Sequence, residues 1–260
     1  MTLSIAIAGK GGIGKTTLSA LLVRGLREAG VRPILAVDAD PNSNLAETLG
    51  VEPGRPLAEI REVGSSPEGS PPSGIGRVRA VEDELQRAIT EADGFDLITM
   101  GRPEGPRCYC AVNNLLRKSL DSLSKNYAAV VVDNEAGMEH ISRRTTNNVD
   151  FLLIVMNPTL PSARAAGRIL ALSLELPVVI GRRMLLINRL GPEGVPEAVE
   201  SELAGLHIER LPDVPQDDEL ERDGVAGRDV FRLPAQSPAM LAVRNAVKEL
   251  CSTAAVLEKH

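Results

Sequence analysis

Short apolar segments alternate along the chain with longer segments in which apolar residues recur at helical spacing. The short segments have the length of buried strands, and they are predicted at 3–8, 33–37, 95–100, 128–132, 151–156 and 183–187. The longer segments are predicted helices, at 16–30, 43–49, 81–93, 110–124, 161–174, 194–204 and 237–250. Strands that alternate with helices form a mostly parallel sheet covered by helices on both faces. The pattern therefore predicts an α/β fold in a single domain spanning 1–260.

One stretch departs from this alternation. Residues 50–78 are rich in Gly, Pro and Ser and include GSSPEGSPPSG, so we expect an irregular surface excursion within the domain. The longest apolar run, FLLIVM at 151–156, is far shorter than the roughly 20 residues that a membrane-spanning helix needs. The chain also opens directly on a strand, without a basic leader, and a cytoplasmic location is expected.

The overall charge limits the classes of partner. A net charge of −6 argues against non-specific nucleic-acid binding, which needs a basic face. Aromatic residues make up only 2% of the chain, too few for base-stacking platforms. The last predicted helix lacks the basic, aromatic-rich amphipathic pattern of a membrane anchor. We therefore expect neither nucleic acid nor membrane as a partner.

A glycine-rich loop between the first strand and the first helix carries the chemistry. It reads GKGGIGKTT and satisfies the G-x-x-x-x-G-K-[ST] pattern in its required strand–helix context. Backbone N–H groups of such a loop turn toward phosphates, and the helix N-terminus adds a positive dipole. We expect Lys15 to reach the β- and γ-phosphates and the Thr16 hydroxyl to bind Mg²⁺. The predicted ATP-binding residues here are Gly9, Gly11, Gly12, Ile13, Gly14, Lys15, Thr16 and Thr17.

A second lysine within the loop, Lys10, is not required to bind a nucleotide in one chain. The segment KGGIGKTT resembles the deviant phosphate loop of the superfamily of ParA, MinD and the nitrogenase iron protein. That resemblance covers most of the chain and implies a P-loop ATPase. It also implies that Lys10 crosses a dimer interface to the partner's nucleotide, and hence that ATP promotes a homodimer.

Further segments carry the same resemblance. VDADP at 37–41 is similar to the first switch, and VVVDNEAG at 130–137 is similar to the Mg²⁺-facing strand and second switch. Asn188 matches the asparagine that reads adenine in the family. LPDVPQDDEL at 211–220 resembles the loop that flanks adenine, which gives Pro212 and Asp213 a role at the base.

Three carboxylates receive roles from chemistry and from this resemblance. Asp40 is predicted to orient or activate the attacking water near the γ-phosphate. Asp38 is predicted to serve either Mg²⁺ or the geometry of the switch. Asp133 ends an apolar strand, where a carboxylate is costly unless it meets solvent, a donor or a cation. Asp133 could therefore be a helix N-cap or could face Mg²⁺. The presence of the phosphate loop favours the Mg²⁺ role.

Two cysteines suggest what the hydrolysis drives. Cys108 and Cys110 stand two apart in a Gly/Pro-rich stretch, RPEGPRCYC, that follows the strand at 95–100. One such pair supplies half of a closed thiolate site, and a twofold dimer would bring four sulfurs together. Four thiolates suit zinc, an iron–sulfur cluster or square-planar nickel. The alternative interpretation is a pair of incidental thiols.

The stretch VVDNEAGMEHISRRTT at 131–146, together with GPRCYC and KGGIGKTT, resembles the maturation ATPases of nickel carbon monoxide dehydrogenase, the CooC family. The resemblance implies an ATPase that binds Ni²⁺, or Zn²⁺, through Cys108 and Cys110 and delivers nickel to the dehydrogenase. Two other hypotheses stand: a positioning ATPase of the ParA/MinD type, and an iron–sulfur electron donor or cluster carrier. The cysteine pair counts against the first, and the absence of a cysteine at 133–146 counts against the second. The roles of His140 and Cys251 stay open.

Overall fold

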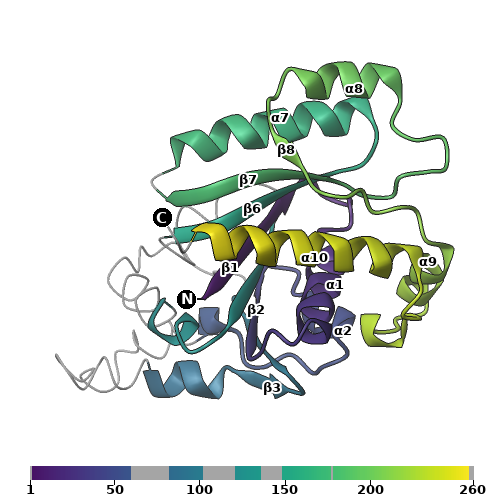
Figure 1. Ribbon diagram of the computed structural model, residues 1–260. Helices are drawn as coiled ribbons and strands as arrows, with labels where there is room; N and C mark the ends of the chain where they lie inside the picture. The colour runs from purple at the N-terminus through teal and green to yellow at the C-terminus, as the bar shows by residue number, and fades with distance from the viewer. Residues whose placement is uncertain (1, 60–81, 102–120, 136–147, 177, 258–260) are drawn as a thin grey trace.

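The predicted alternation of strands and helices is confirmed by a computed structural model that describes residues 2–59, 82–101, 121–135, 148–176 and 178–257. The described residues form an eight-stranded sheet in the order β3-β4-β2-β5-β1-β6-β7-β8 (Figure 1). Every neighbouring pair is parallel except β3 and β4. The strands are β1 (Leu3–Gly9), β2 (Ile34–Ala39), β3 (Thr90–Ala92), β4 (Phe95–Thr99), β5 (Ala129–Asn134), β6 (Asn148–Met156), β7 (Val179–Ile187) and β8 (Glu209–Arg210).

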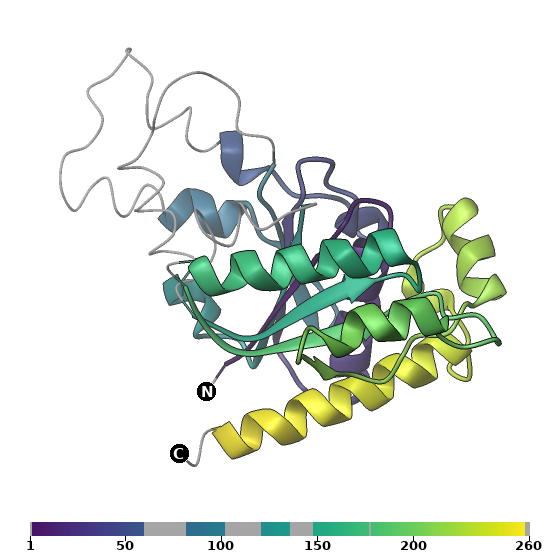
Figure 2. The same cartoon turned by 90° about the horizontal axis from the view of Figure 1, so that it is seen from above.

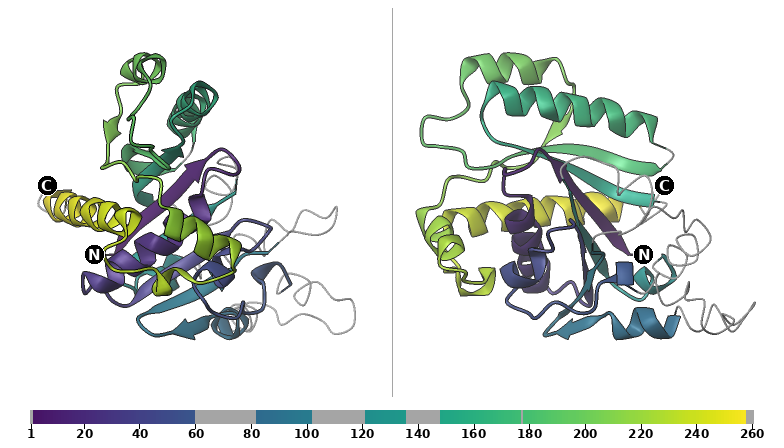
Figure 3. Two further views of the ribbon diagram at one scale, coloured as in Figure 1. Left: turned by 90° about the vertical axis from the view of Figure 1, so that its right-hand side faces the viewer. Right: turned by 180° about the vertical axis from the view of Figure 1, so that it is seen from behind.

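Helices cover both faces of this sheet, as the pattern predicted. The helices α1 (Lys15–Glu28) and α10 (Pro238–Leu257) pack together over one face, and α7 (Leu160–Glu175) and α8 (Glu197–Ala204) lie over the other (Figures 1 and 3). Alternate residues of each central strand enter the two resulting cores. In β1, for example, Ile5 packs toward α1 and Ala6 toward α7. None of the described helices combines the length and apolarity needed to cross a bilayer.

The helix predicted at 81–93 is only partly correct. Residues 82–87 are helical, but Thr90–Ala92 form β3, which pairs antiparallel with β4. The turn between these strands is Asp93-Gly94, and Gly94 adopts a left-handed φ of 84°. An Asp-Gly pair between two short strands is a strong hairpin signal, and it outweighs the helical spacing of the residues before it. Of the helix predicted at 110–124, only 121–124 lie within the described residues, and they are helical.

Two short elements near the C-terminus complete the described fold. The edge strand β8 has only two residues, and α9 (Asp218–Val225) begins within the segment predicted to be an adenine-flanking loop. Asp217 caps α9 by accepting hydrogen bonds from the backbone N–H groups of Glu219 and Leu220. Viewed from above, α9 lies beside the amino end of α10 (Figure 2). The chain between them runs across α1 and forms a short 3₁₀ turn, η1 (Val230–Arg232).

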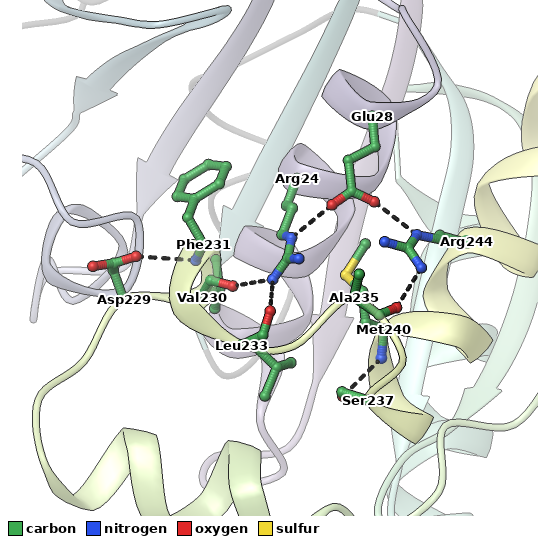
Figure 4. Close-up of polar contacts among 10 residues, drawn as sticks. All are labelled: Arg24, Glu28, Asp229, Val230, Phe231, Leu233, Ala235, Ser237, Met240 and Arg244. Carbon is green, nitrogen blue, oxygen red and sulfur yellow. Dashed lines mark hydrogen bonds and ion pairs between the residues drawn. The ribbon is translucent and has the colours of Figure 1, made fainter.

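A buried arginine fastens this crossing segment to α1. Arg24 donates hydrogen bonds to the carbonyl oxygens of Val230 and Leu233 at 2.5 and 2.7 Å and pairs with Glu28 at 2.8 Å (Figure 4). Glu28 also binds Arg244 of α10 at 2.7 Å. Burial opposes ionisation of Glu28, but the hydrogen bonds from Arg244 and Arg24 leave its pKa below its ordinary value. The carboxyl half of α1 is thus joined to both segments that follow α9.

The first prediction concerns this junction. Replacing Arg24 by Met should lower the free energy of unfolding by roughly 3 kcal/mol, because two buried carbonyl oxygens and a carboxylate lose their donor. Arg87→Met is the matched control, since Arg87 is exposed and its pair with Glu84 should contribute less than about 1 kcal/mol. Urea unfolding measures both variants. Equal losses in the two variants would contradict the assigned role of Arg24.

Candidate functional site

The candidate site lies at the carboxyl edge of the central strands. β1 runs directly into the phosphate loop, β2 ends near Asp38, and β5 ends near Asp133. Asp38 and Asp133 are register partners on adjacent strands, so their side chains project from the same face. Ser19 of α1 hydrogen-bonds Asp133, which identifies this as the face covered by α1. The topology thereby gathers residues that are distant in sequence around the start of α1.

The phosphate loop adopts a conformation that only glycine permits at two positions. Gly14, the N-cap of α1, has a left-handed φ of 90°, and a Cβ there would lie 2.6 Å from Nδ2 of Asn188. At Gly9 a Cβ would lie 2.4 Å from Cδ1 of Ile13 and 2.6 Å from the carbonyl oxygen of Val155. Because no side chain cap occupies the first turn of α1, its N–H groups remain directed at the loop's concave side.

Lys15 is the buried cation of the site. Its side chain is largely covered, and Nζ lies 3.3 Å from the carbonyl oxygen of Lys10. Burial lowers the pKa of Lys15, while the carboxylates of Asp133, Asp40 and Glu135 act in the opposite direction. Lys10 itself is exposed. Lys15 therefore points into the site toward carboxylates, whereas Lys10 is exposed to solvent and accessible to a second chain.

Asp133 is a buried carboxylate beside the start of α1. It is only 1% exposed, and its Oδ1 lies 3.0 Å from the Ser19 hydroxyl. Burial raises the pKa of Asp133 to about 6, against hydrogen bonds from Thr16 and Ser19 and the charge of Lys15. A hard cation such as Mg²⁺ prefers carboxylate, hydroxyl and phosphate oxygens, so Asp133 and Thr16 fit it. Bound there, Mg²⁺ would neutralise phosphate charge.

Asp38 organises the loop that carries Asp40. One of its oxygens accepts the backbone N–H of Asp40 at 3.1 Å, and the other accepts that of Leu45 at 3.0 Å. Asp38 is completely buried, and burial raises its pKa to about 7, with the charge of Asp133 adding to the shift and the two N–H groups opposing it. Asp40 is partly exposed and accepts hydrogen bonds from the N–H and side chain of Asn42. These contacts favour the switch-geometry interpretation of Asp38 over the Mg²⁺ one, and Asp40 stays the predicted catalytic carboxylate.

A cavity of about 490 Å³ adjoins the loop on the side away from β2. Asn188 forms part of its wall and donates its Nδ2 to the carbonyl oxygen of Ile13 at 2.8 Å. This leaves Oδ1 as an acceptor, which suits the amino group of adenine and opposes the carbonyl of guanine. The cavity is lined by Gly14, Thr17, Leu18, Leu21, Asn188, Arg189, Pro215, Asp217, Leu220, Glu221, Gly224 and Val225.

The predicted base contacts at Pro212 and Asp213 do not lie on this cavity. Asp213 instead pairs with Arg210 at 2.6 Å, while the same segment presents Pro215 and Asp217 to the cavity. Sequence reasoning missed Asp217, although an acidic residue just before a polar helical segment is an N-cap signal. Besides capping α9, Asp217 accepts the hydroxyl of Ser237 at 2.5 Å, so it fixes the cavity wall to the start of α10. The geometry thus favours Pro215 and Asp217 as the flanking residues.

The predicted metal ligands Cys108 and Cys110 lie outside the described residues, as does His140. Within the described parts of the chain, no group of three or more His, Cys, Asp or Glu side chains is placed to hold a metal ion. The structure does describe how the chain leaves β4 toward the cysteines. Met100 donates its N–H to the carbonyl oxygen of Asp38 at 2.8 Å, and Gly101 turns with a left-handed φ of 69°.

The second prediction assigns hydrolysis to Asp40 and phosphate binding to Lys15. Asp40→Ala should bind ATP with nearly unchanged affinity and lose about a hundredfold in turnover, the usual scale for a positioned acid or base. Lys15→Ala should instead lose affinity for ATP, because Lys15 is predicted to bind the phosphates. Nucleotide titration and phosphate release, measured on the same preparations, separate the two effects. Wild-type turnover in Asp40→Ala would remove Asp40 from the catalytic role.

The third prediction concerns base selection. Asn188→Ala should weaken ATP binding by about tenfold, since one hydrogen bond to the base is worth on the order of 1 kcal/mol. GTP binding should change little, because the lost acceptor never favoured guanine. Competition titrations with ATP and GTP give the ratio directly. An equal loss for both nucleotides would mean that Asn188 supports the loop at Ile13 without reading the base.

Comparisons with known proteins agree with this geometry. Residues 4–230 match the family described as the CobQ/CobB/MinD/ParA nucleotide binding domain. An uncharacterized ATP-binding protein of Methanocaldococcus jannaschii is 38% identical over 232 residues, which cover 88% of this chain and 91% of that protein. The carbon monoxide dehydrogenase accessory protein CooC of Rhodospirillum rubrum is 35% identical over 194 residues, which cover 68% of this chain and 71% of that protein.

Solved structures share the fold at low sequence identity. The septum site-determining protein MinD of Pyrococcus horikoshii, complexed with Mg-ADP, superposes with a TM-score of 0.72 at 21% identity, over 98% of each chain. MinD of Aquifex aeolicus gives 0.70 at 24% identity, over 96% of this chain and 97% of that one. At these identities the likeness supports the fold alone. The family match and the phosphate loop together establish that the chain belongs to the CobQ/CobB/MinD/ParA family of nucleotide-binding domains and is a P-loop ATPase of the MinD/ParA type.

Proposed function

We propose that this ATPase is a metallochaperone that binds nickel through Cys108 and Cys110 and delivers it to a carbon monoxide dehydrogenase. The observation that carries the proposal is the cysteine pair in a chain that is 35% identical to CooC of Rhodospirillum rubrum, whose name makes it an accessory protein of that enzyme. Nickel is the cargo of the reaction, while ATP supplies the free energy. Thiolates also accept Zn²⁺, so selectivity would come from geometry and metal supply.

The nucleotide site and the cysteine segment are connected through the sheet. β4 lies beside β2 in parallel, with Thr99 in register with Asp38. Directly after β4, the Met100 N–H binds the carbonyl oxygen of Asp38. A change in the Asp38 loop therefore acts on the point from which the chain departs toward Cys108. Such a connection supports a coupling between nucleotide state and metal affinity, which must be reciprocal.

A homodimer would complete both sites. One Cys-x-Cys pair supplies two ligands, and a twofold axis doubles them to four. The exposed Lys10 would reach the partner's nucleotide in the same arrangement. ATP binding then brings the two cysteine pairs together. Hydrolysis removes the γ-phosphate contacts, relaxes the switches at 38–44 and 133–140 and releases the metal.

Two other functions remain as alternatives with distinct signatures. An iron–sulfur carrier would hold iron and sulfide on the same thiolates, which metal analysis of anaerobically purified protein detects. A positioning ATPase of the MinD type would bind a membrane or DNA and would not need the cysteines. The cysteine pair counts against a positioning ATPase, and the CooC relative and the absence of a cysteine at 133–146 favour nickel delivery over an iron–sulfur carrier.

The fourth prediction is the metal stoichiometry. Titration of Ni²⁺ into the ATP-bound Asp40→Ala protein should give one metal per two chains, with a dimer in light scattering. Cys108→Ala and Cys110→Ala should each abolish this binding, because two pairs of thiolates are needed to close the site. Lys10→Ala should keep its cysteines but lose the ATP-dependent dimer and with it the shared metal.

The matched control is Cys251→Ala, which removes the third cysteine of the chain from a partly buried position in α10. Burial raises the pKa of the Cys251 thiol, so it should be a poor ligand, and this variant should bind nickel like the wild type. Nickel binding that survives loss of both Cys108 and Cys110 would contradict the proposed site. A monomeric ATP complex that still binds nickel would contradict only the shared geometry.

A further inference from the structure

One buried hydroxyl at the edge of the ATPase site has no assigned task. Thr99, the last residue of β4, is 1% exposed, and its Oγ1 has no hydrogen-bond partner among the described residues. Burying a hydroxyl without a partner costs on the order of 1–3 kcal/mol. Valine has the same shape and fits a strand at least as well. A threonine at this position therefore calls for an explanation.

The surroundings of Thr99 indicate what its hydroxyl could bind. Across the sheet, Thr99, Asp38 and Asp133 are successive register partners on β4, β2 and β5. Their side chains project from one face, and neighbouring strands are only about 4.8 Å apart. Asp38 is thus the nearest carboxylate along the row. In the described structure both of its oxygens are engaged by the N–H groups of Asp40 and Leu45 instead.

We propose that Thr99 is a positioning residue that supplies a hydrogen bond to Asp38 when the 38–45 loop moves. In this proposal the 38–45 loop shifts toward the γ-phosphate as Asp40 engages the attacking water. The N–H donors of Asp40 and Leu45 then withdraw from Asp38. A buried carboxylate without donors is strongly unfavourable, and the Thr99 hydroxyl can replace one of them after a rotation of the Asp38 side chain. Asp38 thereby has two sets of hydrogen-bond donors: the N–H groups of Asp40 and Leu45 in one position of the loop, and the Thr99 hydroxyl in the other.

The exchange of hydrogen-bond partners at Asp38 would also change the contacts at the end of β4. The Asp38 main chain already accepts the N–H of Met100, the residue next to Thr99. Just beyond, Gly101 is confined because a Cβ there would lie 2.6 Å from Cβ of Pro56. A new hydrogen bond between Asp38 and Thr99 would therefore further restrict the backbone at 99–101. The inference concerns the ATP-driven switch itself and does not depend on the cargo being nickel.

The test compares Thr99→Val, which removes only the hydroxyl, with Thr99→Ser, which keeps it. Thr99→Val should bind ATP normally and melt at the same or a higher temperature, yet its turnover should fall by about tenfold. Thr99→Ser should retain most of the turnover. Ser4→Ala is the matched control, because Ser4 carries another buried, unpartnered hydroxyl near the amino end of β1. That variant should hydrolyse ATP like the wild type.

Hydrogen exchange provides a second readout that a merely structural role would not change. In the wild type, replacing ADP by a non-hydrolysable ATP analogue should alter exchange at 38–45 and at 99–101 together. In Thr99→Val the change at 38–45 should persist and that at 99–101 should disappear. Turnover and exchange in Thr99→Val that match Ser4→Ala would overturn the proposal. Because these assays contain no nickel, a failure of nickel delivery would leave their outcome intact.

Discussion

Two buried carboxylates on adjacent strands dominate the electrostatics of the nucleotide site. Asp38 and Asp133 stand in register at the carboxyl edge of the sheet, both almost entirely removed from solvent. Burial raises the pKa of each, to about 7 and about 6, and the negative charge of Asp133 adds to the shift at Asp38. Lys15 is the cation that acts on Asp133, and burial lowers the pKa of Lys15 itself. A Mg²⁺ ion bound beside this pair would supply positive charge that offsets the two carboxylates.

The rest of the fold holds the surroundings of these carboxylates in place. On one side, α1 presents Ser19 to Asp133, and its far end is fastened by Arg24 to the segment that follows α9. On the other side, Asp217 joins α9 to the start of α10. Burial alone would raise the pKa of Asp217, but hydrogen bonds from Ser237 and from backbone N–H groups leave it below its ordinary value. Hydrogen bonds thus tie the wall of the 490 Å³ cavity to α9 and α10, while the proposed exchange lets the carboxylate of Asp38 change partners when the loop at 38–45 moves.

Sequence patterns predicted the sheet, its helical layers and the phosphate loop because each rests on local periodicity or on a motif with a strict backbone requirement. They failed where two local signals competed. At 81–93 helical spacing concealed the Asp93-Gly94 hairpin, and at 211–220 a loop assignment concealed the cap at Asp217. The register of Asp38 with Thr99 and Asp133 could not be predicted, because it depends on strand order in space. The assignment of Cys108 and Cys110 to a metal rests on sequence, since these residues lie outside the described structure.

If Mg²⁺ binds beside Asp133 together with a nucleotide, its charge should offset that of the buried carboxylate pair. An acid whose pKa is higher in the folded than in the unfolded protein binds more protons when folded, so stability falls as pH rises through the interval between the two values. For Asp38 and Asp133 this interval runs from about 4 to about 7. The most direct test is the melting temperature of wild type and Asp38→Asn from pH 5 to 8, with and without saturating Mg·ADP. We expect the melting temperature of the nucleotide-free wild type to decline with pH, the decline to be smaller in Asp38→Asn, and almost no decline with Mg·ADP. Equal slopes in all conditions would contradict a role of the carboxylate pair in binding Mg²⁺.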